Sequence, residues 1–184
     1  MGTPALPGMD GRADQWLVVI DMQTGFRDAD RSPWGLDRFD DVLPRIQALV
    51  AEFEDRVVFT RYVPSPRPKD GWVDYYDEWP FAVDPQNQDL WEIVPELWHE
   101  GLRVVVEPTF GKWGKALLTA TEGSTNLKLC GVATDCCVLS TALAAADAGA
   151  WVEIASDACA GSSPENHQRA LDAMQLYAPQ IIVN

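Results

Sequence analysis

The chain has 184 residues, 47% of them hydrophobic, which is enough for one globular domain with a buried core. Its 28 acidic and 14 basic residues give a formal net charge of −14. A surface of this sign repels nucleic-acid phosphates and anionic lipids, and no apolar run approaches the roughly 20 residues of a membrane span. We therefore expect a small-molecule ligand, with no nucleic-acid or membrane partner.

The start of the chain is polar and rich in glycine and proline. Because it lacks the apolar segment of a secretory signal, we expect a cytoplasmic protein. We also expect residues 1–14 to form a flexible segment and residues 15–184 to form one domain.

The cysteines and histidines offer little material for a metal site. Cys130, Cys136, Cys137 and Cys159 form no C-x-x-C pair, and the sequence contains only two histidines. We therefore expect no metal and no other cofactor, and free thiols in a reducing compartment.

Six apolar runs, rich in β-branched residues, have the continuous apolar pattern of strands buried on both faces. They cover residues 16–20, 56–60, 102–106, 127–130 and 151–155, with a weaker run at 181–183.

The first long helical pattern covers residues 39–53, where apolar side chains recur at helical spacing. Proline is tolerated in the first turn of a helix but not deeper. Pro44 therefore predicts a helix that begins nearer Leu43.

Two further helices follow later in the chain. The alanine-rich run 136–148 ends before Gly149, a common stop signal, and residues 164–176 begin with Ser163 as N-cap and Pro164 at the first helical position. Strands that alternate with helices predict a single-domain α/β fold, with a doubly wound, mostly parallel sheet of about six strands and helices on both faces.

The stretch 64–89 departs from this rhythm, because it contains five prolines and few periodic apolar residues. Irregular connections of this length are often lids or binding loops, and this one follows a strand's carboxyl end, where open α/β sheets bind ligands. We expect a lid or pocket loop. The alternative is that its aromatic residues cover a sheet edge or a subunit interface.

Asp21 directly follows the strand at 16–20. The carboxyl end of a central strand is the expected active-site edge, where a carboxylate can serve as a general base. A turn or capping aspartate is the alternative for this residue taken alone.

Cys136 and Cys137 follow the strand at 127–130, in the expected first turn of a helix that Thr134 or Asp135 would cap. A thiol at this position faces the positive end of the helix, which stabilises a thiolate, and the same amides could hold an oxyanion. The alternative is packing of small residues against the sheet. Helical periodicity does not choose between the two neighbouring thiols.

Two motifs resemble the signatures of a known family. Val18–Gln23 reads VVIDMQ and Gly131–Val138 reads GVATDCCV, and Ser156–Cys159 with His167 is similar too. Together they resemble the isochorismatase-like cysteine hydrolases, a superfamily that includes nicotinamidases and N-carbamoylsarcosine amidases. The resemblance covers residues 17–183 and implies the family's α/β (Rossmann-like) fold.

The resemblance implies a role for each matched residue. Asp21 would be the general base, and Cys137 the nucleophile, because the family thiol lies three residues after the motif threonine. A cis peptide would join Val132 to Ala133, and the amides of Ala133 and Cys137 would form the oxyanion hole. Gln23 would lie near the substrate.

The match departs from the family at the third catalytic group, a lysine just after the third strand. An ungapped match places Glu107 there, in the run VEPTFGK. Lys112 would have to reach back into the site, and Lys115 is a weaker candidate. Without either lysine, the carboxylates of Asp21 and Glu107 would face each other, and one of them would be protonated.

A second departure concerns metal and substrate binding. Nicotinamidases of this superfamily bind a metal through residues after the second strand, but residues 60–65 contain no histidine, which disfavours that activity. Arg61 could bind a substrate carboxylate, or form a surface salt bridge. The aromatic pocket is expected from Tyr62, Trp79, Phe81 and Trp113.

These features predict a hydrolase that cleaves a C–N bond of a small amide, carbamoyl or lactam-like compound through a thioester. One alternative is an acid-catalysed hydrolase of isochorismate-type vinyl ethers, and another is an inactive member that serves as a binding subunit. The family commonly assembles as dimers or tetramers, so we expect a homodimer or homotetramer.

Overall fold

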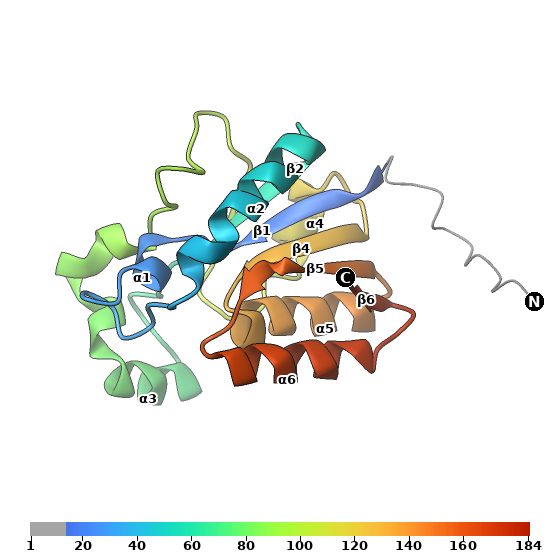
Figure 1. Ribbon diagram of the computed structural model, residues 1–184. Helices are drawn as coiled ribbons and strands as arrows, with labels where there is room; N and C mark the ends of the chain where they lie inside the picture. The colour runs from blue at the N-terminus through green and yellow to red at the C-terminus, as the bar shows by residue number, and fades with distance from the viewer. Residues whose placement is uncertain (1–13) are drawn as a thin grey trace, which may run out of the picture.

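The computed structural model describes residues 14–184, so the expected flexible segment 1–14 lies outside the described residues, apart from Asp14. Six parallel strands form one sheet in the order β3-β2-β1-β4-β5-β6 (Figure 1). The strands are β1 (Trp16–Ile20), β2 (Val57–Tyr62), β3 (Val104–Glu107), β4 (Asn126–Val132), β5 (Trp151–Ala160) and β6 (Ile181–Val183). The predicted doubly wound α/β fold is confirmed, and each predicted run overlaps one strand.

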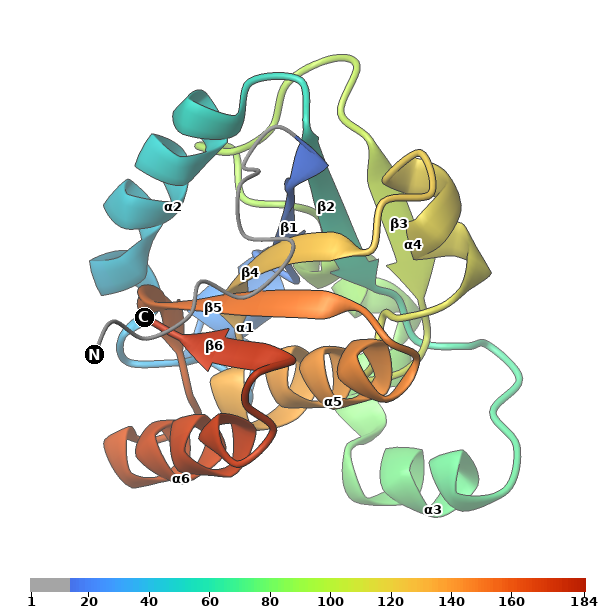
Figure 2. The same cartoon turned by 90° about the vertical axis from the view of Figure 1, so that its right-hand side faces the viewer.

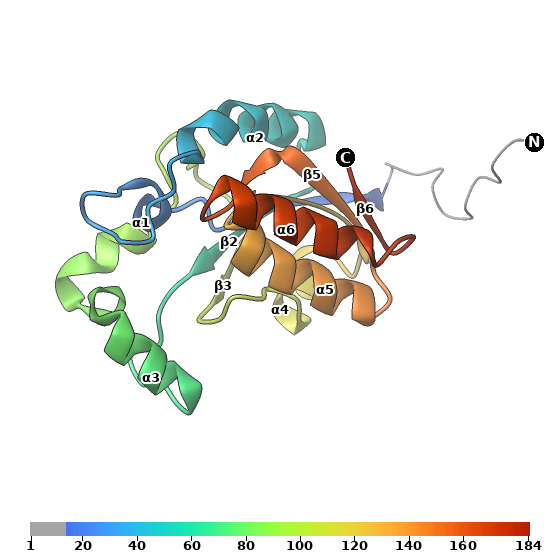
Figure 3. The same ribbon diagram turned by 60° about the horizontal axis from the view of Figure 1, so that its bottom comes forward.

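The helices cover both faces of the sheet. The helix α2 (Phe39–Phe53) packs on the face formed by β1, β4 and β5, and α4 (Lys115–Ala120), α5 (Leu139–Asp147) and α6 (Pro164–Gln175) lie on the opposite face (Figures 2 and 3). All five residues of β1 are buried, as a central strand covered on both faces requires.

The strand order reverses between β1 and β4. The chain moves outward from β1 through β2 to β3, and outward from β4 through β5 to β6 in the other direction. Open α/β sheets bind ligands outside the carboxyl ends of the strands at such a switch point.

The predicted start of α2 was wrong. The helix begins at Phe39 and continues through Pro44, whose side chain is exposed to solvent. Proline removes one backbone hydrogen bond, but the buried face of the helix offsets this cost by removing apolar area from water. That face consists of Phe39, Val42, Leu43, Ile46, Leu49 and Phe53.

The stretch 64–89, expected to be an irregular loop, is largely helical. It contains α3 (Gly71–Glu78), the 3₁₀ turn η2 (Pro80–Val83) and the first part of η3 (Pro85–Trp91). The prolines that suggested a loop include Pro80 and Pro85, each at the first position of a 3₁₀ turn, where no amide hydrogen is needed. The helix α3 protrudes beyond the carboxyl ends of the strands (Figure 3).

Within the described part of the chain, no helix combines the length and the apolar character needed to span a membrane.

Candidate active site

Asp21 lies directly after β1, with its side chain fully buried. Its backbone φ is +48°, in the left-handed region that aspartate adopts more readily than most residues. The Asp21 amide donates to Thr60 Oγ1 at 3.1 Å, and Thr60 Oγ1 donates to Asp21 Oδ1 at 2.6 Å. A residue of the neighbouring strand β2 therefore fixes both the backbone and the carboxylate of Asp21.

Lys112 reaches Asp21 from the loop between β3 and α4. Lys112 Nζ lies 3.0 Å from Asp21 Oδ2, and the side chains of both residues are 0% exposed. Nζ also donates to the carbonyl of Thr109 at 2.5 Å and lies 5.4 Å from the centroid of the Tyr62 ring. The backbone amide of Lys112 donates to Thr141 Oγ1 at 3.0 Å.

The other two candidates for this position lie elsewhere. Lys115 is exposed at the start of α4, and Glu107 is half-buried at the end of β3, opposite Tyr62 in the register of the sheet. The buried partner of Asp21 is thus the ammonium group of Lys112, not the carboxylate of Glu107.

The two oxygens of the Asp21 carboxylate differ. Oδ1 accepts the hydrogen bond from Thr60, whereas Oδ2 lies beside Lys112 Nζ without the alignment of a hydrogen bond. Among the described residues, Oδ2 is the buried side-chain oxygen that accepts no hydrogen bond. It is therefore the oxygen available to accept a proton.

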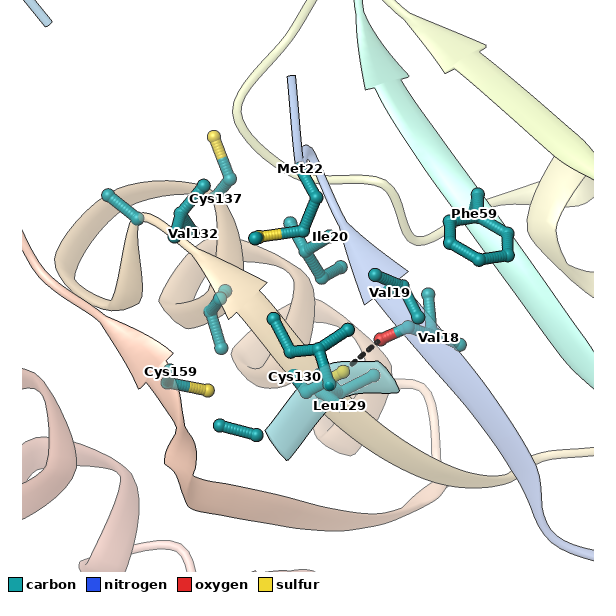
Figure 4. Close-up of a cluster of buried hydrophobic side chains, with 14 of the residues drawn as sticks. Val18, Val19, Ile20, Met22, Phe59, Leu129, Cys130, Val132, Cys137 and Cys159 are labelled. Atoms are coloured by element: carbon teal, nitrogen blue, oxygen red, sulfur yellow. Dashed lines mark hydrogen bonds between the residues drawn. The ribbon is translucent and has the colours of Figure 1, made fainter. Parts of the chain in front are cut away.

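Cys137 lies in the π-helical turn η4 (Thr134–Val138), which follows β4 and leads into α5. In Figure 4 its sulfur points away from Cys130 and Cys159. The peptide bond between Val132 and Ala133 is cis, as the resemblance implies.

The environment of the Cys137 thiol differs from our expectation of a stabilised thiolate. Burial raises its pKa well above the ordinary value, and the negative charge of Asp21 raises it further, while Lys112 opposes this change. Burial dominates because an ion in an apolar site loses its hydration. Burial therefore favours the neutral thiol over the thiolate at this position.

The expected cap of this turn was also wrong. The N-cap residue of η4 is Ala133, which has no capping side chain. Asp135 instead accepts hydrogen bonds from the amide and hydroxyl of Ser162 at 2.8 and 2.6 Å, and Thr134 Oγ1 lies 2.9 Å from His167 Nδ1. Both side chains thus connect the turn to the segment that begins α6.

The other two buried thiols belong to the core. Cys130 Sγ donates to the carbonyl of Val18 at 3.9 Å (Figure 4), and burial raises its pKa well above the ordinary value. Burial also raises the pKa of Cys159, to about 12.

A cavity of about 240 Å³ opens at Cys137. Its wall is mostly aromatic or apolar and contains no charged side chain. The lining residues are Phe26, Pro33, Trp34, Gly35, Leu36, Tyr62, Tyr75, Trp79, Phe110, Ala133, Cys136, Cys137 and Ser162. A wider groove of about 750 Å³ lies beside α3, but neither Asp21 nor Cys137 lines it.

Of the residues predicted to bind substrate, Tyr62 and Trp79 line this cavity, and Phe81, Trp113 and Glu107 do not. Phe81 packs behind the wall, with its ring centroid 4.8 Å from that of Trp34.

The predicted substrate contacts of Gln23 and Arg61 are not supported, because both side chains form hydrogen bonds with other protein groups. Gln23 Nε2 donates to the carbonyls of Tyr62 and Trp91 at 2.9 and 2.6 Å, and its Oε1 accepts from the Tyr62 amide at 2.8 Å. Arg61 donates to the carbonyl of Trp91 at 2.8 Å and to Glu92 at 2.6 Å, which is the salt-bridge alternative.

Several residues of the site escaped the sequence-based prediction. Thr60 lies in a strand with no motif of its own, but its place at the carboxyl end beside β1 could have indicated a contact with Asp21. Trp34 belongs to a segment that lacks periodicity, so no local signal placed it at the cavity. Tyr75 was not singled out, but it lies in the stretch 64–89 that is expected to form a lid or pocket loop, and it lines the cavity.

The fold and the arrangement of a cysteine, an aspartate and a lysine define a class of α/β hydrolase, and comparisons identify the family. The isochorismatase domain family matches residues 15–183. The chain therefore belongs to the isochorismatase-like hydrolase family, as its motifs indicated.

Individual relatives agree. Isochorismatase domain-containing protein 2 of Rattus norvegicus is 37% identical over 91 residues, which are 48% of this chain and 43% of that protein. The match thus spans less than half of that relative's length. An uncharacterized isochorismatase family protein, YecD, of Escherichia coli O157:H7 is 29% identical over 171 residues, 85% of each chain.

Solved structures show the same fold. A cysteine hydrolase from Pseudomonas syringae pv. phaseolicola 1448A superposes with a TM-score of 0.80 at 17% identity, covering 100% of this chain and 94% of that one. A pyrazinamidase of Pyrococcus horikoshii in complex with zinc gives a TM-score of 0.71 at 25% identity, covering 93% and 98%.

A zinc ion of that kind does not fit the residues present here. Among residues 14–184, the His, Cys, Asp and Glu side chains form no group of three or more that could hold a metal ion. We therefore assign no catalytic step to a metal.

Proposed function

We propose that the protein is a cysteine hydrolase that cleaves the C–N bond of a small, uncharged amide or carbamoyl compound. Asp21 would be the general base, Cys137 the nucleophile and Lys112 the cationic partner of both. The observation that carries this proposal is the fully buried Lys112–Asp21 ion pair, 3.0 Å long, beside the thiol that opens into the cavity.

The ion pair explains how a buried carboxylate can serve as a base. Burial of a single charge costs several kcal/mol, and a partner of opposite charge compensates much of this cost. The Lys112 ammonium therefore offsets the cost of burying the Asp21 carboxylate, which the proposal uses as the base. Thr60 occupies Oδ1, so Oδ2 is the oxygen that would take it.

The first half of the reaction forms a thioester. Asp21 Oδ2 takes the proton of Cys137 Sγ, and the thiolate attacks the carbonyl carbon of the substrate. The C–N bond then breaks, and the amine leaves with the proton that Asp21 held. Since this proton transfer removes the charge of Asp21, the Lys112 ammonium then faces the thiolate, whose negative charge it stabilises.

The second half regenerates the enzyme. Water attacks the thioester and gives a proton to Asp21, the C–S bond breaks, and the thiolate recovers the proton from Asp21. An amide gives a carboxylic acid and an amine, or ammonia from a primary amide, and a carbamoyl compound gives a carbamic acid in place of the carboxylic acid. The amide of Ala133, the N-cap residue of η4, and the amide of Cys137 within η4 would donate to the oxyanion in both halves.

The wall of the cavity favours an uncharged substrate. It contains aromatic rings, apolar side chains and hydroxyl groups, but no cationic group that could pair with a carboxylate. This observation weighs against isochorismate-type substrates, which carry carboxylates. The fully buried Lys112–Asp21 ion pair weighs against acid catalysis, because an acid-catalysed reaction would have to break that pair to protonate Asp21.

The test is hydrolysis by the purified protein of a panel of uncharged primary amides and carbamoyl compounds, followed by release of ammonia. Acid quenching and mass spectrometry of tryptic peptides should find an acyl group on Cys137. We expect Cys137→Ala to abolish turnover and the adduct, and Cys159→Ala, which removes a core thiol, to retain both.

An inactive wild type across the panel would contradict the proposal and favour a binding subunit. Turnover of a vinyl ether that survives in Cys137→Ala would instead favour acid catalysis.

A further inference from the structure

One wall of the cavity comes from a single short segment, Pro33–Leu36, in the connection between α1 (Thr24–Arg27) and α2. The indole of Trp34 is the largest side chain of this segment, and it packs among the other aromatic rings of the site. Its ring centroid lies 4.8 to 6.2 Å from those of Phe26, Tyr62, Tyr75, Trp79, Phe81 and Trp91. Trp34 therefore limits the cavity with a large, well-packed ring.

The backbone of this wall is held in place by its own hydrogen bonds. The amide of Leu36 donates to the carbonyl of Phe26 at 2.9 Å, and the amide of Gly35 donates to the carbonyl of Ser32 at 3.0 Å. A Cβ atom at Gly35 would lie 2.5 Å from the Cα atom of Ala29, so the segment folds back on itself where only glycine fits.

A salt bridge anchors the same connection to the stretch that carries η3. Arg31 donates to both carboxylate oxygens of Asp89, at 2.7 and 2.8 Å. The wall is thus a folded part of the site, with its shape present before a substrate binds.

The volume of the cavity indicates the size of the substrate that can bind at this wall. About 240 Å³ lies below the roughly 300–1,000 Å³ typical of sites for drug-sized ligands. An apolar cavity of about 150 Å³ can hold benzene. The space at Cys137 is therefore sufficient for an amide group with one ring or a short branched chain.

From these observations the geometry points to Trp34 as the residue that sets substrate size. The enzyme accepts amides whose apolar part is no larger than a single ring, and the indole excludes larger groups. This inference rests on the proposed function, because it names the substrate class of that same site.

The first experiment compares benzamide with 2-naphthamide by ammonia release. In Trp34→Ala, kcat/KM for 2-naphthamide relative to benzamide should rise about tenfold or more, since a change of pocket size by one group typically alters discrimination by this amount. Trp34→Phe should give an intermediate ratio. Trp98→Ala is the matched control, because Trp98 is 55% exposed and lies outside the cavity.

A second experiment measures the opening of the cavity without turnover. In a Cys137→Ala background, Cys136 is the half-exposed thiol on the wall, whereas Cys130 and Cys159 are buried. The rate of alkylation of Cys136 by N-(1-pyrenyl)maleimide relative to N-methylmaleimide should rise when Trp34→Ala is added. It should not change with Trp98→Ala.

The two readouts separate the inference from the proposed function. If no amide is hydrolysed but the alkylation ratio rises, the proposed function fails and the role of Trp34 stands. If Trp34→Ala is folded and both ratios equal those of the wild type, Trp34 serves only packing and the inference is overturned.

Discussion

Two lysine–carboxylate pairs lie at opposite ends of the sheet. At the carboxyl end, Lys112 and Asp21 lie 3.0 Å apart with side chains 0% exposed. Near the amino ends of β4 and β5, Lys128 and Glu153 lie 2.7 Å apart with side chains 12% and 23% exposed.

The two carboxylates have different hydrogen-bond partners. Burial alone would raise the pKa of Glu153, but hydrogen bonds from Lys128, Gln15 and Asn184 hold it below its usual value. Asp21 instead keeps one oxygen without a hydrogen bond, near a thiol whose pKa is raised by burial. The Glu153 carboxylate is thus held by several hydrogen-bond donors, whereas the Asp21 carboxylate leaves one buried oxygen unoccupied.

The largest expected effect is on turnover. Asp21→Asn should lower kcat by about 10²–10⁴-fold, the usual contribution of a general base, whereas Glu153→Gln should leave kcat unchanged. Steady-state kinetics on an amide substrate measures both. Equal losses in the two variants would mean that Asp21 acts only through the stability of the fold.

The next largest expected difference is in how much each lysine contributes to the free energy of unfolding. Lys112→Met leaves the Asp21 carboxylate buried without its charged partner and should lower the free energy of unfolding by about 3–5 kcal/mol. Lys128→Met, where water reaches the pair, should cost about 1 kcal/mol. Urea denaturation measures both values.

The double variant Asp21→Asn/Lys112→Met provides the control, because it removes both buried charges. It should recover most of the lost stability without recovering turnover. A Lys112→Met protein as stable as Lys128→Met would contradict the description of a desolvated pair.

The pH dependence of thiol labelling sharpens the electrostatic part of the comparison. Because burial and Asp21 place the Cys137 pKa well above its ordinary value, alkylation by iodoacetamide should rise about tenfold per pH unit from about pH 7 to pH 9. Asp21→Asn removes a charge that raises this pKa, so labelling at each pH should become faster while turnover falls. A plateau below pH 8, or slower labelling in the variant, would indicate a thiolate at rest.

The smallest expected effect concerns the position of Lys112. Thr141 Oγ1 accepts from the Lys112 amide and donates to the Cys137 carbonyl at 2.7 Å, so it joins the loop of the lysine to the turn of the thiol. Thr141→Val should lower kcat roughly fivefold and stability by about 1 kcal/mol. Thr121 is another buried threonine whose hydroxyl bonds to carbonyl groups, so Thr121→Val should lower stability by a similar amount but leave kcat unchanged.

Local patterns predicted most of the fold. The run 16–20 coincides with β1, and Ser163 caps α6 by accepting from the Asn166 amide at 3.1 Å, as its sequence indicated. Both predictions succeeded because continuous apolar runs and helix caps are encoded by a few neighbouring residues.

The errors fell where tertiary contacts override local preference. Pro44 lies inside α2 because the buried face stabilises the helix, and the proline-rich stretch that includes α3 folds against aromatic residues from other segments. The contact of Lys112 with Asp21 is non-local as well. Sequence spacing left open whether Lys112 reached the site, because its position depends on the path of the loop after β3.

Gly131, in β4, approaches the backbone of β1 so closely that a Cβ atom there would lie 2.1 Å from the carbonyl oxygen of Ile20. Asp21 is the next residue after Ile20, and the turn that carries Cys137 begins shortly after Gly131. The separation of Asp21 from the turn that carries Cys137 is therefore fixed by a direct contact between two backbones. The Pro33–Leu36 wall belongs to another part of the chain, so substitutions there can reshape the cavity without disturbing the backbone contact that positions Asp21 and the turn of Cys137.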